Sequence, residues 1–332
     1  MVDTIYVEKE VLSFPVTEKV IQHYHRANVV SIEKYAEVFN VKSQNFRAQK
    51  KRPSLILAKK YGKKIISAPD EYEIGGDENY YFSHMLNCVY DCRYCFLQGM
   101  YRSANYLLFA NYDDFAEELR AHVRESNAKN PWYFSGYDCD SLALEPITGF
   151  ANYFLKVFSE QEMSKATLEL RTKSTQIRSL LNQETLNNVV VAFSLNPDAV
   201  ISSVEAGTPE LGKRLHAIKS LQDAGWKVGI RFDPVIWHNQ FETHYRQFFQ
   251  TVFETIHSEE LDSITLGAVR LPKDFHKKIS NLYPEHWLFK AGLELNQKGL
   301  VTYNEKASNS LLSFCQTEIE KYVAIDKLYI YR

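Results

Sequence analysis

Short apolar runs alternate with amphipathic stretches along the chain from residue 80 to residue 269. The apolar runs are rich in β-branched and aromatic residues, which favours buried strands. Six strands are predicted on this basis: Tyr80–Ser83, Pro131–Gly136, Thr167–Thr172, Val189–Leu195, Lys227–Phe232 and Ile264–Val269. Between them, apolar residues at helical spacing predict helices, clearest at Asp113–Glu125, Pro209–Ala224 and Phe241–Ile256. Six strand–helix units in series indicate an α/β fold with parallel strands, either an open doubly wound sheet or a partly closed barrel.

The helix predicted at Pro209–Ala224 has clear signals at both ends. Thr208 suits the N-cap, Pro209 suits the first helical position, and Gly225 directly follows the last residue. These residue types are favoured at those places. We therefore expect the helix to begin directly after Thr208.

The regions on either side of the strand–helix array are less regular. Before it we predict a helix near Thr17–Tyr24 and a short strand at Ser54–Ala58. After it we predict a hairpin around Leu293–Tyr303, a helix at about Asn304–Val323 and a strand at Lys327–Tyr331. The expected organisation is an N-terminal segment at 1–78, an α/β core at 79–270 and a C-terminal extension at 271–332 that packs on the core.

Three of the five cysteines lie within eight residues, as C-x3-C-x2-C at Cys88, Cys92 and Cys95. Their loop follows the first predicted strand, at the edge of a parallel sheet where active sites gather. An iron–sulfur cluster held by only three thiolates keeps one iron open, whereas a structural zinc site needs four protein ligands. His84 would complete a Cys3His zinc site. A zinc-containing protein that binds nucleic acid is therefore one alternative.

The composition is that of a globular protein in a reducing compartment. The chain has 332 residues, of which 45% are hydrophobic and 24% are charged, enough for a sizeable core. No apolar run approaches the roughly 20 residues of a membrane span, and the first residues lack the basic and apolar regions of a signal peptide. An odd number of cysteines, three of them crowded, argues against a disulfide framework. We expect a cytoplasmic location.

A basic segment lies within the N-terminal region, although the net charge is only −2. Between Lys42 and Lys64 the chain has nine lysine and arginine residues and no acidic residue. Such a segment is either a solvated face or a surface that contacts phosphates. The residues that we expect to contact nucleic acid are Lys50, Lys51, Arg52, Lys59 and Lys60.

The cysteine motif resembles the signature of the radical S-adenosylmethionine superfamily, and a longer resemblance links the chain to its spore photoproduct lyase family. This resemblance runs from Tyr6 to about Ala268. Cys88–Gln98 is similar to the family's Cys-x3-Cys-x-Tyr-Cys-Tyr-Leu-Gln. Further segments follow in the family's order and spacing: Thr172-Lys173, Phe193–Asn196, Glu205–Thr208, Leu211–Arg214 and Tyr245-Arg246. The fold implied is a partial (β/α)6 TIM-like barrel with an N-terminal basic segment and a C-terminal hairpin and helix.

The resemblance implies two cofactors and an electron donor. Cys88, Cys92 and Cys95 would hold a [4Fe-4S] cluster, and the open iron would bind S-adenosylmethionine. One electron from the cluster then cleaves that molecule to a 5′-deoxyadenosyl radical, so a donor such as flavodoxin or ferredoxin is required. The cofactor-binding residues implied are Lys173 and Ser194 for the methionyl carboxylate, and Tyr94 and Phe96 for the adenine.

The activity implied is that of a carbon–carbon lyase that repairs DNA. In the lesion two adjacent thymines are joined through a methyl carbon. The adenosyl radical takes a hydrogen atom from the saturated ring, the linking bond breaks, and a cysteine returns a hydrogen atom to the product radical. DNA with a damaged pyrimidine is therefore the expected substrate.

Several positions depart from the family pattern. Tyr137 takes the place of the donor cysteine, and Cys139 follows two residues later, on the same face of an extended segment. Phe96 replaces a tyrosine whose phenolic hydrogen the family passes along a relay. The candidate catalytic residues are therefore Cys139, Tyr94 and Tyr137. The family's hairpin arginine also finds only Gln297-Lys298-Gly299 here. A second alternative follows: a family member that acts on another nucleobase, RNA or a small molecule.

Overall fold

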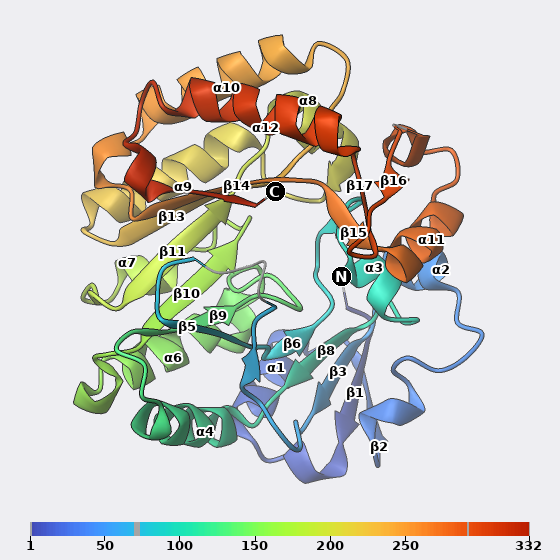
Figure 1. Cartoon of the computed structure of the whole chain (residues 1–332). Helices are drawn as coiled ribbons and strands as arrows, with labels where there is room; N and C mark the ends of the chain where they lie inside the picture. The colour runs from blue at the N-terminus through green and yellow to red at the C-terminus, as the bar shows by residue number, and fades with distance from the viewer. Residues whose placement is uncertain (1, 70–73, 291, 332) are drawn as a thin grey trace.

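The computed structural model describes residues 2–69, 74–290 and 292–331. Its main sheet has the strand order β18-β14-β13-β11-β10-β9-β5-β4 (Figure 1). The strands are β4 (Ile66–Ser67), β5 (Glu78–Phe82), β9 (Pro131–Ser135), β10 (Thr167–Thr172), β11 (Val189–Ser194), β13 (Lys227–Val235), β14 (Ser263–Ala268) and β18 (Leu328–Tyr331). Neighbours from β5 through β18 pair in parallel, and β4 adds an antiparallel edge. All six predicted strands are confirmed.

The main sheet curls into a half-barrel, so the partly closed barrel is the correct choice between the two predicted folds (Figure 1). The helices that follow its strands are α4 (Tyr112–Glu125), α5 (Glu145–Thr148), α6 (Phe150–Phe158), α7 (Arg178–Leu181), α8 (Asp198–Val204), α9 (Leu211–Asp223) and α10 (Phe241–Thr255). Their apolar residues pack on the sheet; in α4 these are Phe115, Leu119 and Val123. The three clearest predicted helices are confirmed.

One helix start is wrong in the sequence prediction. Helix α9 begins at Leu211, and Glu210 takes the N-cap position instead of Thr208. The Thr208 hydroxyl donates to the Glu205 carbonyl oxygen and accepts a hydrogen bond from Arg214. The buried Arg214 guanidinium thus donates a hydrogen bond to the hydroxyl that would otherwise cap the helix. Gly225 follows the C-cap with φ +86°, as its position predicts.

A second, five-stranded sheet lies beside the half-barrel, in the order β2-β1-β3-β8-β6 (Figure 1). Its elements are β1 (Thr4–Glu8), α1 (Pro15–His23), β2 (Asn28–Ile32), α2 (Phe46–Lys51), β3 (Leu55–Ala58), β6 (Met85–Leu86) and β8 (Tyr106–Phe109). The predicted early helix and the strand near residue 55 are confirmed. Strands β6 and β8 come from beyond residue 78, on either side of the cysteine loop. The loop is therefore anchored at both ends in this second sheet.

The C-terminal region adds a small sheet, two helices and the last strand of the main sheet. These elements are β15 (Arg270–Pro272), α11 (Lys273–Leu282), β16 (Glu294–Leu295), β17 (Leu300–Thr302) and α12 (Glu305–Ile319). Strands β16 and β17 form the predicted hairpin, and α12 and β18 match the predicted helix and strand. β18 pairs in parallel with β14, so the chain's last strand extends the half-barrel.

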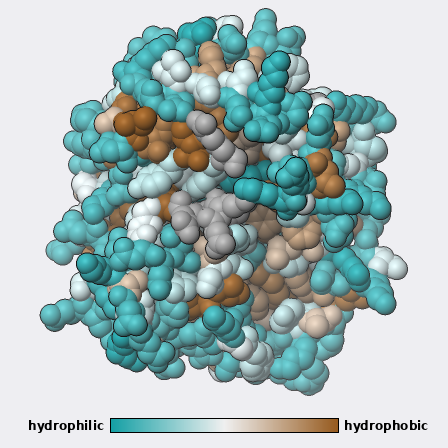
Figure 2. All heavy atoms as spheres, viewed as in Figure 1, coloured by the Kyte–Doolittle hydropathy of each residue, from teal (hydrophilic) through white to brown (hydrophobic). Residues whose placement is uncertain are grey.

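The surface seen in Figure 2 is mostly hydrophilic, with hydrophobic residues gathered nearer the middle of the view. Among the described residues, no helix combines the length and the apolar character that a membrane crossing needs.

A charged cluster is buried inside the half-barrel. Glu169 of β10 accepts from Arg231 of β13 at 2.8 Å and from Arg171 at 2.8 Å. Burial opposes the charge of Glu169, but the two guanidinium groups outweigh it and lower the pKa of the carboxyl to about 2. A carboxylate without a partner at this depth would be strongly destabilising. The Glu169–Arg231 pair therefore links β10 to β13, the strands on either side of β11 in the curled sheet.

We expect Glu169→Gln to destabilise the protein by about 3–5 kcal/mol at pH 7, because Arg231 is left buried without its counter-ion. Since the folded pKa is lower than the unfolded one, the stabilisation by Glu169 is present above about pH 4.5 and is lost as the pH falls towards 2. Urea unfolding at several pH values should show the gap to the wild type narrowing in acid. Glu160→Gln, which removes a partly exposed partner of Arg120, is the control and should cost at most about 1 kcal/mol. A gap independent of pH would contradict the assignment.

Candidate active site

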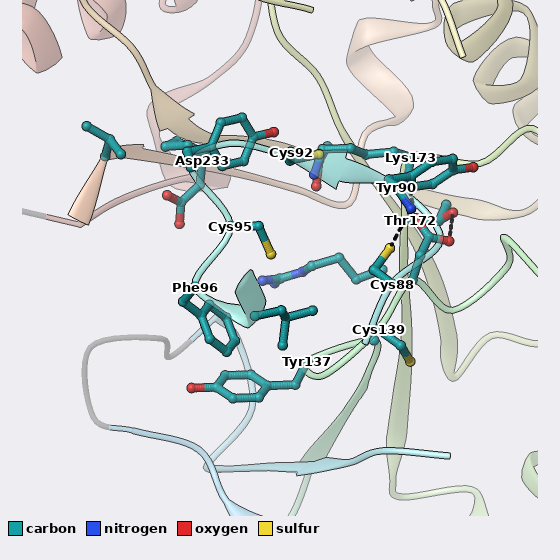
Figure 3. A pocket seen from close by; sticks show the side chains of 18 of the residues that line it. Cys88, Tyr90, Cys92, Cys95, Phe96, Tyr137, Cys139, Thr172, Lys173 and Asp233 are labelled. Atoms are coloured by element: carbon teal, nitrogen blue, oxygen red, sulfur yellow. Dashed lines mark hydrogen bonds between the residues drawn. The ribbon is translucent and has the colours of Figure 1, made fainter. Parts of the chain in front are cut away.

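A pocket of about 200 Å³ opens at the carboxyl ends of the main-sheet strands (Figure 3). The cysteine loop forms one wall, and the ends of β9, β10, β11 and β13 form the others. Residues 269–271, which follow β14, also line the pocket. The pocket thus lies where the carboxyl ends of parallel strands meet, which is the usual place of an active site in such folds.

The sulfur atoms of Cys88, Cys92 and Cys95 all point into this pocket (Figure 3). Cys92 lies in β7 (Asp91–Cys92), which pairs antiparallel with β12 (Glu205–Ala206). α3 (Leu97–Met100) begins two residues after Cys95, with Phe96 at its N-cap. Burial raises the pKa of the Cys88 thiol to about 12 and raises those of the other two as well. Three thiols from one short loop that line one cavity fit a cluster that keeps one iron open.

His84 does not join the three cysteines. Its ring stacks on Phe150, with centroids 3.6 Å apart, and its Nδ1 lies 3.8 Å from the Cys139 sulfur. Burial lowers the pKa of His84 to about 3, so the ring is neutral. His84 is not among the residues that line the pocket, whereas the three cysteines are. The Cys3His zinc site of the alternative interpretation is therefore not formed.

Polar side chains from distant elements hold the backbone of the cysteine loop. The Lys50 ammonium, from α2, donates to the carbonyl oxygens of Cys88 and Tyr90, at 3.0 Å each. Gln98 donates to the carbonyl oxygen of Cys92 and accepts from the Tyr283 hydroxyl at 2.7 Å. The sequence pattern assigns Lys50 to a nucleic-acid surface, but in the structure its ammonium is bonded to the backbone of the cysteine loop. No local sequence signal marks this role, because 38 residues separate Lys50 from Cys88.

Lys173 and Ser194 lie at the ends of neighbouring strands and line the same pocket as the cysteines. The ammonium of Lys173 is 5.6 Å from the centre of the Tyr94 ring, and its backbone N–H donates to Asp140 at 2.7 Å. Burial alone would lower the pKa of Lys173, but electrostatic interactions with Cys92 and with the Glu205 carboxylate raise it above its ordinary value. An ammonium that stays charged beside a hydroxyl suits a carboxylate.

Behind Tyr94 lies a buried network whose role the sequence did not reveal. The Tyr94 hydroxyl donates to Glu205, which also accepts from Arg214 at 2.6 Å and from Asn196 at 2.9 Å. Arg214 also donates to the carbonyl oxygen of Ser194 at 3.1 Å. These residues belong to segments that resemble the family, which was the only available signal. The network fixes the Tyr94 ring and the end of β11 together.

Tyr137 and Phe96 lie together at one side of the pocket (Figure 3). Their ring centroids are 5.4 Å apart, and Tyr137 also stacks on Tyr81 at 4.3 Å. Cys139 is in a different situation, although it also borders the pocket. It is 6% exposed and packs with the apolar core of the second sheet, which includes Met85. The structure therefore separates the two candidate hydrogen donors.

The remaining basic residues do not form one surface. Lys59 pairs with Asp114 at 3.5 Å, and Lys60 lies over the Phe109 ring, where burial lowers its pKa. Lys51 and Arg52 are exposed at the end of α2. The five residues expected to contact nucleic acid thus have different surroundings.

Comparison with known proteins gives consistent matches. The sequence model of the family described as spore photoproduct lyase matches residues 1–306. The spore photoproduct lyase of Bacillus subtilis (strain 168) is 22% identical over 301 residues, which cover 89% of this chain and 84% of the relative. That of Geobacillus sp. (strain Y412MC61) is 21% identical over 288 residues, or 85% and 82% of the two chains. A solved double mutant of spore photoproduct lyase, with bound AdoMet and dinucleoside spore photoproduct, has a TM-score of 0.86 at 19% identity and covers 100% of this chain and 98% of that one. At this identity the structural likeness establishes the fold, and the sequence model establishes the family.

We expect Lys50→Met to lower the iron and sulfide content of the anaerobically reconstituted protein, because two loop carbonyls lose their donor at a cost of about 1–3 kcal/mol. Lys50→Arg, which keeps a cationic donor, should restore part of the content. Lys51→Met is the matched control on the same helix and should behave as the wild type. Full iron content in Lys50→Met would show that the two hydrogen bonds are dispensable.

Proposed function

Because the chain belongs to the spore photoproduct lyase family, we propose that it is a radical S-adenosylmethionine lyase that repairs a thymine photoproduct in DNA. The observation that carries this proposal is the convergence of the Cys88, Cys92 and Cys95 sulfurs on a pocket at the strand ends. The structures of relatives with bound AdoMet and dinucleoside spore photoproduct support a DNA-derived substrate. The family match spans most of the chain, including every residue of the pocket.

The residues of the pocket fit the two cofactors. We assign Cys88, Cys92 and Cys95 to a [4Fe-4S] cluster, and Lys173 with Ser194 to the methionyl carboxylate of S-adenosylmethionine. When bound, this pair of cofactors supplies a 5′-deoxyadenosyl radical. The ammonium of Lys173 stays charged and would neutralise the carboxylate, which the buried site could not otherwise accept.

Tyr94 acts in this proposal by orienting rather than by giving up a hydrogen atom. Its hydroxyl is tied to Glu205, and burial raises the pKa of the phenol well above its ordinary value. The ring therefore stays neutral and fixed beside Lys173, where it offers a flat surface for the adenine. Phe96, which borders the pocket on the other side of Cys95, offers a second apolar surface.

Tyr137 is the group that we assign to return a hydrogen atom to the product radical. Its ring borders the pocket, whereas the Cys139 thiol packs against the second-sheet core and His84. The phenolic O–H bond breaks, the hydrogen atom forms a C–H bond on the thymine radical, and a phenoxyl radical remains. Phe96, beside it, has no hydroxyl to pass the radical on. One electron from a protein reductant and one proton from solvent then restore Tyr137.

The aromatic rings of Phe96 and Tyr137, which line the pocket, and of Tyr81 behind Tyr137 also fit a nucleobase substrate. Tyr81, Tyr137 and Phe96 are consecutive neighbours, with ring centroids 4.3 and 5.4 Å apart. Stacking of a base on an aromatic ring contributes about 1–3 kcal/mol. This surface would accept a thymine that has turned out of the helix. The altered hairpin at Gln297–Gly299 favours a second possibility, a substrate other than the family's lesion.

We expect the anaerobically reconstituted protein to convert a spore photoproduct within an oligonucleotide to two thymines. Because Phe96 interrupts the relay, at least about one 5′-deoxyadenosine should form per lesion repaired. Chromatography with mass detection measures both products, and Cys92→Ala, which lacks one cluster ligand, is the negative control. Cleavage of S-adenosylmethionine with an unchanged lesion would contradict the proposed substrate. Deuterated S-adenosylmethionine would then identify the true substrate among modified bases, RNA and small molecules.

Tyr137→Phe should lower the yield of repaired thymine at least about tenfold while S-adenosylmethionine is still cleaved, because only the final hydrogen transfer is lost. Cys139→Ala should stay within about twofold of the wild type, since the thiol packs in the apolar core of the second sheet and against His84. Product yield and 5′-deoxyadenosine are measured together for both variants. The reverse pattern would assign the hydrogen transfer to Cys139.

A further inference from the structure

We propose that the exposed basic face of α2, formed by Arg47, Lys51 and Arg52, is the docking surface for an acidic protein that delivers single electrons to the cluster. The inference rests on the proposed function, because it names the partner that the pocket needs. Nothing in the pocket itself supplies an electron, so the reductant must approach the cysteine loop from outside. The position and charge of α2 indicate that the reductant approaches at this helix.

The helix α2 touches the cysteine loop directly. Lys50, the residue before Lys51, donates from its ammonium to the carbonyl oxygens of Cys88 and Tyr90 at 3.0 Å each. The exposed face therefore adjoins Lys50, whose side chain bonds directly to the backbone of Cys88, a cysteine that we assign to the cluster. A carrier seated on this face would lie close to the cluster, as transfer of an electron between two proteins requires.

α2 approaches the loop from outside the pocket. No residue of α2 lines the pocket, which is formed by the loop and the strand ends. The cysteine loop thus lies between α2 and the space for S-adenosylmethionine and substrate. A carrier on α2 would leave the pocket mouth at Tyr137 open. Reduction and substrate binding can then occur on one molecule at the same time.

The charge of this face favours an acidic partner. Arg47, Lys51 and Arg52 are all exposed, and no carboxylate of the described residues pairs with them. One further cation adjoins the loop: Arg93, which pairs with Asp91, lies 4.1 Å from the centre of the Tyr283 ring, and Arg47 lies 5.7 Å from the same centre. A concentrated positive face on a chain of net charge −2 attracts a negatively charged protein and speeds association.

DNA is the other polyanion that this face might serve, but the surroundings favour a compact protein. Lys59 is paired with Asp114 and Lys60 is turned onto Phe109, so the basic segment does not continue as a track along which a DNA backbone could lie. Arg47, Lys51 and Arg52 are grouped at one short helix beside the loop, whereas Lys42 and Lys63, which are also exposed, lie outside that helix. DNA that reaches the pocket mouth would approach a different wall of the site.

The test uses the reconstituted full chain with the double substitution Lys51→Glu and Arg52→Glu. Cleavage of S-adenosylmethionine is measured with dithionite and, separately, with reduced flavodoxin as the acidic carrier, over a range of salt concentrations. We expect the dithionite rate to be unchanged. The flavodoxin rate should fall at least about tenfold at low salt and lose its salt dependence. Lys129→Glu with Lys156→Glu, two exposed lysines on other elements, is the matched control and should leave both rates unchanged.

Three outcomes would overturn the proposal. Equal loss with dithionite would mean that the substitutions damage the cysteine loop. An unchanged flavodoxin rate with weaker binding of lesion-containing DNA would assign the face to DNA. Equal loss of the flavodoxin rate in the control variant would mean that only total charge matters. The readout is cofactor cleavage, so it remains valid if the lesion is not repaired, and a failure of the proposed substrate is recognised separately by an unchanged oligonucleotide.

Discussion

The buried ion pair between Glu205 and Arg214 is the interaction on which the site depends. Both side chains are fully buried, and a charge at that depth is tolerated only when it is paired and hydrogen-bonded. Glu205 lies in β12, which pairs with β7 and therefore with Cys92, and its carboxylate also holds the Tyr94 hydroxyl. Arg214 extends the same network to the end of β11 at Ser194. One ion pair thus fixes Cys92, the Tyr94 ring and the end of β11 relative to one another.

The cysteine loop is also held from its opposite side by the second sheet. The chain leaves the half-barrel after β5, forms β6, passes through the loop and α3, and returns as β8 before α4 begins. Lys50 adds hydrogen bonds to the loop backbone from α2. A loop that must present three sulfurs to one cavity needs a defined backbone, and here two separate sheets provide it. The N-terminal region is in this sense part of the active site.

The parts of the structure that were predictable are those set by local patterns. The strands of the half-barrel are long apolar runs separated by helices, so periodicity alone places Val189–Ser194 and its neighbours. The second sheet escaped prediction because β6 has two residues and pairs with β8 across the cysteine loop. The prediction of Thr208 as an N-cap is wrong because the buried Arg214 side chain bonds to its hydroxyl. The role of Lys50 cannot be predicted locally because its partners in the cysteine loop are distant in sequence. Each miss reflects a tertiary contact that outweighs a local preference.

Phe96 and Tyr137 both depart from the family pattern, and their effects on the proposed mechanism are linked. A phenol at Tyr137 keeps a donatable hydrogen atom at the pocket mouth, while a phenyl ring at Phe96 removes the hydroxyl that would carry the radical back towards the cofactor. In the proposed mechanism, the radical left on Tyr137 is quenched by an electron from outside the site. Such an enzyme would draw one electron to start each turnover and a second to end it. Such an enzyme would therefore need more electrons from a protein reductant than a site that returns its radical to the cofactor. A basic surface beside the cysteine loop, which attracts an acidic reductant, would then matter more for turnover.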